Sequence, residues 1–266
     1  MSPVHRPIQL RTAFLSDIHL GSRDCRTDLV LDFLHSVHVE ELILVGDIVD
    51  IWSLRRNLYW PQSHSDVLRA ILGKAKHGTR VVFVPGNHDE QFRKVGGSIF
   101  GQVEVHREYV HQTRAGKRLL VVHGDEFDGA VTCNRWLAML GCGLYDVALG
   151  LNRAVNRLRR HFGYGYWSLA GYLKSRIGNA MQYVHRFEQT AARAARRRGL
   201  DGVVCGHIHR PALTEIEGVL YCNDGDWVDS CSALVERCDG ELELWHWAEL
   251  ARRGLPGRAS ALPSAA

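Results

Sequence analysis

The sequence predicts an α/β fold, in which strands of a buried sheet alternate with helices. Five short apolar runs end in polar clusters: IQLRTAFL at 8–15, LILV at 42–45, RVVFV at 80–84, RLLVV at 118–122 and GVVC at 202–205. Each run is too short for a typical helix and is typical of a strand. Helical patterns lie between some of these runs, at about 26–36, 62–76 and 181–198. This alternation indicates an α/β sheet.

The bulk composition is that of an ordinary globular protein. The 266 residues are 45% hydrophobic and 23% charged, and the formal net charge of +4 does not by itself indicate a nucleic-acid partner. Seven Cys without paired short spacings do not resemble a disulfide framework or a zinc knuckle. Reduced thiols in a cytoplasmic protein are therefore expected.

Neither a signal peptide nor a transmembrane helix is expected. The first residues, MSPVHRPIQLRTAF, lack a continuous apolar core, and no charge-free apolar run reaches the roughly 18–20 residues of a membrane span. We expect a cytoplasmic protein, with possible peripheral contact with the inner face of the membrane.

The chain divides into a core, an insertion and a tail. Residues 1–127 and 181–250 carry the strand pattern and are expected to form the core. Residues 128–180 lack that pattern and are rich in Leu, Ala, Trp and Tyr, so an inserted helical cap is expected there. The Ala, Arg, Pro and Ser of 251–266 predict a disordered tail.

The polar clusters after the five runs supply many groups that bind metals. They read SDIH, GDIVD, PGNHD, HGD and GHIH, and they contain Asp17, His19, Asp47, Asp50, Asn87, His88, His123, His207 and His209. Ligands in α/β sheets usually bind outside the carboxyl ends of strands, so these groups should share one edge. A lone buried His is more often a core residue than a ligand. Nine unpartnered polar groups at one edge, however, would cost several kcal/mol to desolvate, and metal ions would satisfy them together.

The ligand types predict two divalent ions. Oxygen and imidazole ligands without thiolate fit Mn²⁺ first, with Fe or Zn²⁺ as alternatives. Two metals about 3.5–4 Å apart are the arrangement used for in-line displacement at phosphorus. Asp47, at the centre of the set and directly after Gly46, is the expected bridging carboxylate.

In their order along the chain, these clusters resemble the motifs of the calcineurin-like metallophosphoesterases. They correspond to D-x-H at 17–19, G-D-x-x-D at 46–50, G-N-H-D at 86–89, H-G-D at 123–125 and G-H-x-H at 206–209. The motifs span most of the core. The resemblance implies a four-layer α/β/β/α sandwich with two metals at one edge.

The resemblance also implies a role for each residue. Asp17, His19 and His209 would hold the first metal and Asn87, His123 and His207 the second, with Asp47 between them. His88 would protonate the leaving oxygen or steady charge on the phosphoryl group. Asp50 would fix the tautomer of His88. Water activated between the metals would be the nucleophile.

A narrower resemblance concerns the substrate. SDIHLGS, GDIVDIW and GHIHRP, with a helical insertion after HGD, are similar to the UDP-2,3-diacylglucosamine pyrophosphatases of lipid A synthesis. This implies cleavage to UMP and a lipid monophosphate. His88 departs from that branch, in which Arg is common at this position, and follows the broader superfamily. Two alternatives are a general phosphodiesterase or phosphatase for soluble nucleotides or other diphosphates, and a non-catalytic metal-bound scaffold.

The insertion is expected to bind this phosphorylated, lipid-linked substrate. Its basic residues are positioned to meet a diphosphate and its aromatic residues to line an acyl groove; the candidates are Arg157, Arg160, Lys174, Trp136 and Tyr164. Alternatively, the aromatic residues only pack the cap and the arginines form a solvated face.

Two further polar segments lie outside these motifs. Asn223, Asp226 and Asp229 in NDGDWVDS either contact substrate or bond their own turn. The basic segment RAARRRG at 193–199 lies on a predicted helix end, where cations favour the helix dipole, so no nucleic-acid partner is expected.

Overall fold

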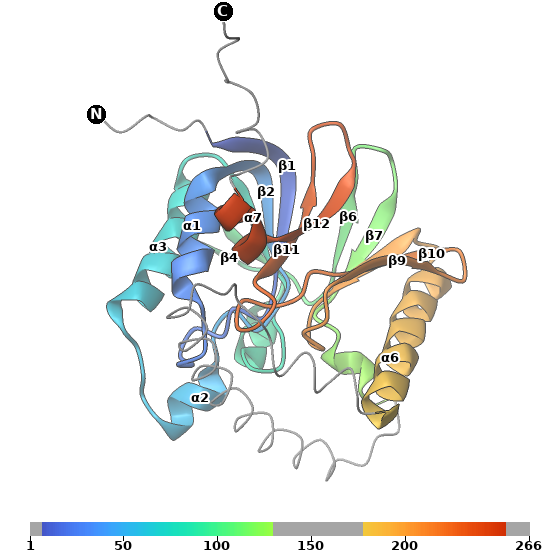
Figure 1. Cartoon of the computed structure of the whole chain (residues 1–266), viewed down its shortest axis with the longest axis horizontal. Helices are drawn as coiled ribbons and strands as arrows, with labels where there is room; N and C mark the ends of the chain where they lie inside the picture. Colours follow the sequence, from blue (N-terminus) through green and yellow to red (C-terminus); the bar gives the residue numbers. More distant parts are fainter. Residues whose placement is uncertain (1–6, 130–177, 254–266) are drawn as a thin grey trace, which may run out of the picture.

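The computed structural model describes residues 7–129 and 178–253, which form two β-sheets with helices on their outer faces (Figure 1). The first sheet has seven strands in the order β12-β11-β1-β2-β3-β5-β4. These are β1 (Ile8–Leu15), β2 (Val37–Leu44), β3 (Arg80–Phe83), β4 (Ile99–Phe100), β5 (Val103–Val105), β11 (Ser232–Glu236) and β12 (Leu242–His246). The four strands β1, β2, β3 and β5 run parallel, so the loops that follow β1, β2 and β3 leave the sheet at the same edge.

The second sheet has five strands in the order β6-β7-β8-β10-β9. These are β6 (Tyr109–Gln112), β7 (Arg118–Val121), β8 (Gly202–Cys205), β9 (Ala212–Ile216) and β10 (Val219–Asn223). Here β7, β8 and β10 are parallel, and β6 and β9 are antiparallel edge strands.

Helices cover the outer face of each sheet. The helices α1 (Thr27–Ser36), α3 (Gln62–Lys76) and α7 (Trp247–Arg253) share one apolar cluster with the first sheet, and α6 (Gly178–Arg197) shares another with the second. In Figure 1, α6 lies on the opposite side of the molecule from α1 and α3. The short elements α2 (Ile51–Arg56), η1 (Glu90–Val95) and η2 (Asp125–Phe127) follow strand ends.

A third apolar cluster lies between the two sheets. Phe14, Ile43 and Val82 of the first sheet pack there with Val121 and Val204 of the second, and all five are fully buried. The layers are therefore helix, sheet, sheet and helix, which confirms the predicted fold class. The apolar runs became strands because each offers a face to one of these clusters.

The structure adds to the expected elements and corrects one boundary. The strand β2 begins at Val37, ahead of the expected 42–45, and α6 begins at Gly178, ahead of the expected 181. Residues 251–253, expected in the tail, belong to α7, because that helix continues to pack beside α1. Of the proposed cap at 128–180, residues 130–177 lie outside the described residues, as do the tail residues 254–266. Residues 178–180 belong to α6.

Two other expectations concern thiols and membranes. The cysteines within the described ranges, Cys25, Cys205, Cys222, Cys231 and Cys238, are free, as expected of reduced thiols. In the described part of the chain, no helix combines the length and the apolar character that crossing a membrane requires.

Candidate metal centre

Five loops from both sheets meet at one edge of the sandwich. The loops after β1, β2 and β3 come from the first sheet, and those after β7 and β8 come from the second. Backbone hydrogen bonds join them in pairs: Asp17 N–H donates to Gly46 O at 3.0 Å, and Gly206 N–H donates to His123 O at 3.0 Å. The predicted convergence of the polar clusters is therefore present.

The backbone of this edge is left-handed at many non-glycine positions. Asp17, His19, Asp47, His207 and His209 have φ between 51° and 67°. Such values are uncommon outside glycine and cost about 1–3 kcal/mol each, and they cluster at functional sites. All five positions carry candidate metal ligands.

Close backbone approach is also built into this edge at Gly86. A Cβ atom at this position would collide with Asp47 Oδ1 and with the ring of His123. Only glycine lets the turn after β3 lie against two candidate ligands from other strands.

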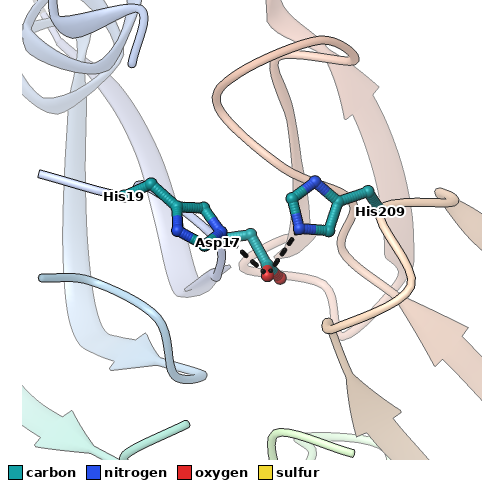
Figure 2. Close-up of side chains that lie close together, drawn as sticks. All are labelled: Asp17, His19 and His209. Atoms are coloured by element: carbon teal, nitrogen blue, oxygen red, sulfur yellow. Dashed lines mark ion pairs between the residues drawn. The ribbon is translucent and has the colours of Figure 1, made fainter. Parts of the chain in front are cut away.

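The first group of candidate ligands surrounds Asp17. Figure 2 shows its carboxylate between the imidazoles of His19 and His209. The Oδ1 atom lies 3.0 Å from His209 Nε2 and 3.6 Å from His19 Nε2. The other oxygen, Oδ2, accepts a hydrogen bond from the backbone of His207 at 2.9 Å, which fixes the carboxylate.

The second group surrounds Asp47, which the sequence predicted as the bridge. Its Oδ2 lies 3.3 Å from His123 Nε2 and 3.9 Å from His19 Nε2. Its Oδ1 accepts from the backbone N–H of His88 at 2.8 Å. Asp47 thus lies between a histidine of the first sheet's loops and one of the second's, as a shared ligand would.

Several buried atoms at this edge have no hydrogen-bond partner among the described residues. They are Asp17 Oδ1, His19 Nε2, Asn87 Oδ1, His123 Nε2 and His209 Nδ1. Each unpartnered buried polar atom costs about 1–3 kcal/mol. Three overlapping groups, Asp17–His19–His209, His19–Asp47–His88 and Asp17–Asp47–His123, have ligand atoms within 4.8 Å of one another. Oxygen and imidazole donors that converge without partners fit divalent metal ions.

The electrostatics of the site favour bound positive charge. Burial alone would raise the pKa of Asp17 and lower that of His19. Attraction of Asp17 to His209 and His19, and hydrogen bonds of His19 to Asp17 and Asp50, outweigh burial. The pKa of Asp17 therefore lies well below its usual value and that of His19 well above it. Attraction to Asp47 likewise raises the pKa of His123 against the effect of burial. A metal ion would replace these protons, because it binds neutral imidazole and ionised carboxylate.

Comparison with known proteins decides the family. The family model described as calcineurin-like phosphoesterase matches residues 10–211, from β1 to the loop beyond β8. The chain belongs to the calcineurin-like phosphoesterase family. It is a phosphoester hydrolase, and the family implies divalent metal ions, which the candidate ligands at this edge fit.

The relatives of this phosphoesterase carry a more specific name. A protein of Xanthomonas campestris pv. campestris named UDP-2,3-diacylglucosamine hydrolase is 26% identical over 251 residues, which is 87% of this chain and 97% of the relative. A protein of the same name from Ectopseudomonas mendocina is 25% identical over 222 residues, 76% of this chain and 83% of the relative. Among solved structures, Yfce, a phosphoesterase from E. coli, is similar with a TM-score of 0.44 and 15% identity, covering 88% of this chain and 98% of that one.

His88 of the phosphoesterase is held by a carboxylate and covered by an indole. Its Nδ1 lies 2.8 Å from Asp50 Oδ1, so the ring donates there and leaves Nε2 free to face Asp47 Oδ2 at 3.9 Å. Trp52 lies against the ring with centroids 4.3 Å apart. Asp50 also caps α2 by accepting from Ser53 N–H and Oγ. Burial opposes its ionisation, but hydrogen bonds from His19 and His88 lower its pKa.

Asp89 has a structural role that the sequence analysis did not assign. Its buried carboxylate accepts from Gly86 N–H at 2.6 Å and from Ile48 N–H at 2.8 Å, which ties the loop after β3 to the loop after β2. Burial, with the nearby Asp47, raises the pKa of Asp89 to about 6. Asp89 is the last residue of the G-N-H-D motif, and this position was the feature of the sequence that could have indicated its role.

His207 and Asn87 are expected at the second metal, but neither belongs to the three groups of ligand atoms within 4.8 Å of one another. The ring of His207 lies 5.2 Å from that of His123, outside the three tight groups, and its Nε2 is 2.9 Å from Asp128 Oδ2. Asn87 adjoins His88 in the turn, with Oδ1 buried and unpartnered.

The polar segment after β10 follows the turn-bonding alternative at two positions. Asn223 is fully buried, and its Oδ1 accepts from the backbone of Gly225 at 3.0 Å. Asp226 accepts from the backbone of Val228 at 2.8 Å. Asp226 also lies 3.8 Å from His209 Nδ1.

A pocket of about 270 Å³ opens between the loop after β1 and α2. Arg23, Arg56 and Tyr59 are among its lining residues, and the Arg23 guanidinium lies 4.9 Å from the centre of the Tyr59 ring. The substrate candidates Trp136, Arg157, Arg160, Tyr164 and Lys174 lie outside the described residues.

Proposed function

We propose that this phosphoesterase is a dinuclear metal-dependent pyrophosphatase that cleaves a UDP-linked acylated sugar, such as UDP-2,3-diacylglucosamine, to UMP and a lipid monophosphate. The main support for metal-dependent hydrolysis is the convergence of unpartnered Asp and His atoms at one edge of the sandwich. The names of the two relatives support the substrate.

The proposed ligands divide into two sets around Asp47. Asp17, His19 and His209 would hold one ion, and Asn87, His123 and His207 the other, with Mn²⁺ as the proposed metal. When bound, the ions would polarise a phosphoryl oxygen and lower the pKa of water towards about 7. No separate general base is then required for the attack.

The proposed acid is His88. Hydrogen bonding of Nδ1 to Asp50 leaves Nε2 as the atom that faces the metal edge, where it can meet the leaving oxygen or a charged phosphoryl oxygen. The Trp52 ring restricts solvent access to one face of the imidazole. Asp50, anchored at the start of α2, holds the orientation of His88.

The substrate is proposed to contact both the core and the insertion. Arg23 and Arg56, which line the pocket between the loop after β1 and α2, are proposed to add positive charge from the core. Arg157, Arg160 and Lys174 are proposed to meet the diphosphate, and Trp136 and Tyr164 the acyl chains. We further propose a cytoplasmic protein that meets its acylated substrate at the inner membrane face, with 128–180 as the cap of a core formed by 1–127 and 181–250.

Mn²⁺-loaded protein incubated with UDP-2,3-diacylglucosamine in detergent micelles tests the proposal, with released UMP measured by chromatography. We expect UMP in amounts equal to the lipid monophosphate, and none from a matched Asp47→Ala variant. His88 follows the broader superfamily, which favours a general phosphodiesterase as the second candidate. Cleavage of bis(p-nitrophenyl) phosphate with the UDP lipid left intact would establish that second candidate instead. Inactivity on both, with two metals bound, would indicate a scaffold.

A further inference from the structure

The carboxylate of Asp128 joins three elements beside the metal edge. It follows η2, and its Oδ2 accepts from His207 Nε2 at 2.9 Å. Its Oδ1 accepts from the hydroxyl of Tyr183, on α6, at 2.5 Å. These bonds connect residues that are 79 and 55 positions apart in the sequence, so the fold alone brings them together.

The His207 ring is also held by packing and by its backbone. Phe187 of α6 lies against it with centroids 6.1 Å apart, and Phe127 packs edge-on against Phe187 at 5.7 Å. The backbone N–H of His207 donates to Asp17 Oδ2, and the residue has a φ of 67°. The imidazole is therefore constrained, and Asp128 occupies one of its two nitrogens.

Other histidines of the site are held in a comparable way. His123 donates from Nδ1 to Val45 O at 2.8 Å, which leaves Nε2 towards Asp47. His88 donates from Nδ1 to Asp50, which also leaves Nε2 towards Asp47. In each case, one nitrogen is bound by a fixed acceptor and the other faces the edge. Metal-binding histidines commonly donate their second N–H to a carboxylate or carbonyl in this manner.

We propose that Asp128 is a positioning residue that holds His207 as its Nε2–H tautomer and thereby presents Nδ1 to the second metal ion. Tyr183 in turn holds the carboxylate. The inference rests on the proposed dinuclear centre and deepens it. The Asp128 side chain is 47% exposed, and each of its two oxygens accepts a hydrogen bond, one from His207 and one from Tyr183.

Calorimetric titration of metal-free protein with Mn²⁺, checked by metal content after dialysis, tests the role of Asp128. Wild type should bind two ions. Asp128→Ala should bind one of the two about 10–100-fold more weakly, the usual effect of losing such a partner. Asp128→Asn should restore most of the affinity, because its amide oxygen still accepts from Nε2–H. Tyr183→Phe should weaken the same ion by less.

A matched control is Glu217→Ala, which removes an exposed carboxylate that pairs with Arg193 of α6 at 3.3 Å. It should leave both affinities unchanged. Equal affinities of wild type and Asp128→Ala for both ions would overturn the role of Asp128. If Asp128→Ala does not fold, Tyr183→Phe decides, because unchanged binding in that variant would equally overturn the role. Fewer than two ions in wild type would instead overturn the dinuclear centre itself.

Discussion

Backbone strain and unpartnered buried polar atoms coincide at Asp17, His19 and His209 of this phosphoesterase. Eight described non-glycine residues have positive φ, and five of them are among the seven proposed metal ligands. Aspartate and histidine tolerate the left-handed region better than most residues, which helps to explain why these types follow the strands. The strain persists because hydrogen bonds between neighbouring loops fix each position.

A substitution at His88 separates catalysis from metal binding. Because His88 donates to Asp50 and faces Asp47 only at 3.9 Å, His88→Ala should keep both metals and lose about 10²–10⁴-fold in kcat, the usual range for an acid–base group. Steady-state rates and metal content measure this. His77→Ala, a surface histidine at the end of α3, is the matched control and should change neither quantity. Loss of a metal ion in His88→Ala would show that His88 is a metal ligand. Its place in the His19–Asp47–His88 group would then explain that result.

At the scale of elements, a buried histidine joins the two sheets away from the metal edge. His111 of β6 lies 2.9 Å from Glu41 of β2 through Nδ1 and 2.9 Å from Glu236 of β11 through Nε2. Burial alone would lower the pKa of His111, but bonds to the two glutamates raise it above 6.5. The same bonds, with those from Arg114 N–H and Arg11, lower the pKa of Glu236 to about 2 against the effect of burial.

These shifts predict how stability depends on pH. The contribution of His111 is complete below its unfolded pKa of 6.5 and is lost as the pH rises through its higher folded pKa. The contribution of Glu236 is present above 4.5 and is lost as the pH falls towards 2. His111→Phe should cost about 1.5–3 kcal/mol near pH 5.5 for each charge-assisted hydrogen bond that is lost. Glu236 keeps its bond to Arg11 and Glu41 its bond to Arg80, so neither carboxylate becomes unpaired.

Urea unfolding of metal-free wild type and His111→Phe at pH 5.5 and pH 9 measures this effect. The gap between the two proteins should narrow at pH 9. His19 and His123 titrate in both proteins, so their effects cancel in the comparison. A gap that is equal at the two pH values would show that His111 does not carry the charge.

The sequence predicted the elements that carry local patterns. The strands β1, β3, β7 and β8 and the helices α1 and α3 lie within a residue or two of their expected positions, because apolar runs and helical periodicity are local properties. The strands β4 and β5 have two and three residues, too few to show a period. In β2, buried Val37 and Val39 alternate with exposed His38 and Glu40, a signal that extends the strand beyond its apolar run.

At the scale of the whole molecule, the site exists only where the two sheets meet. Loops of the first sheet supply Asp17, His19, Asp47 and Asn87, and loops of the second supply His123, His207 and His209. The motifs in the sequence predicted that these loops converge, because so many Asp, Asn and His side chains at strand ends would be costly to bury without metal ions to bind them. They did not predict the contact of Asp128 with His207, which arises from packing between distant segments.

Diffraction from crystals grown with Mn²⁺, recorded at the manganese absorption edge, tests the central claim most directly. Two anomalous peaks are expected, about 3.5–4 Å apart. One should lie against Asp17, His19 and His209, the other against Asn87, His123 and His207, with the Asp47 carboxylate between them. Crystals of Asp47→Ala should lack both peaks. A single peak in the wild-type protein, or two peaks that do not share Asp47, would contradict the dinuclear centre.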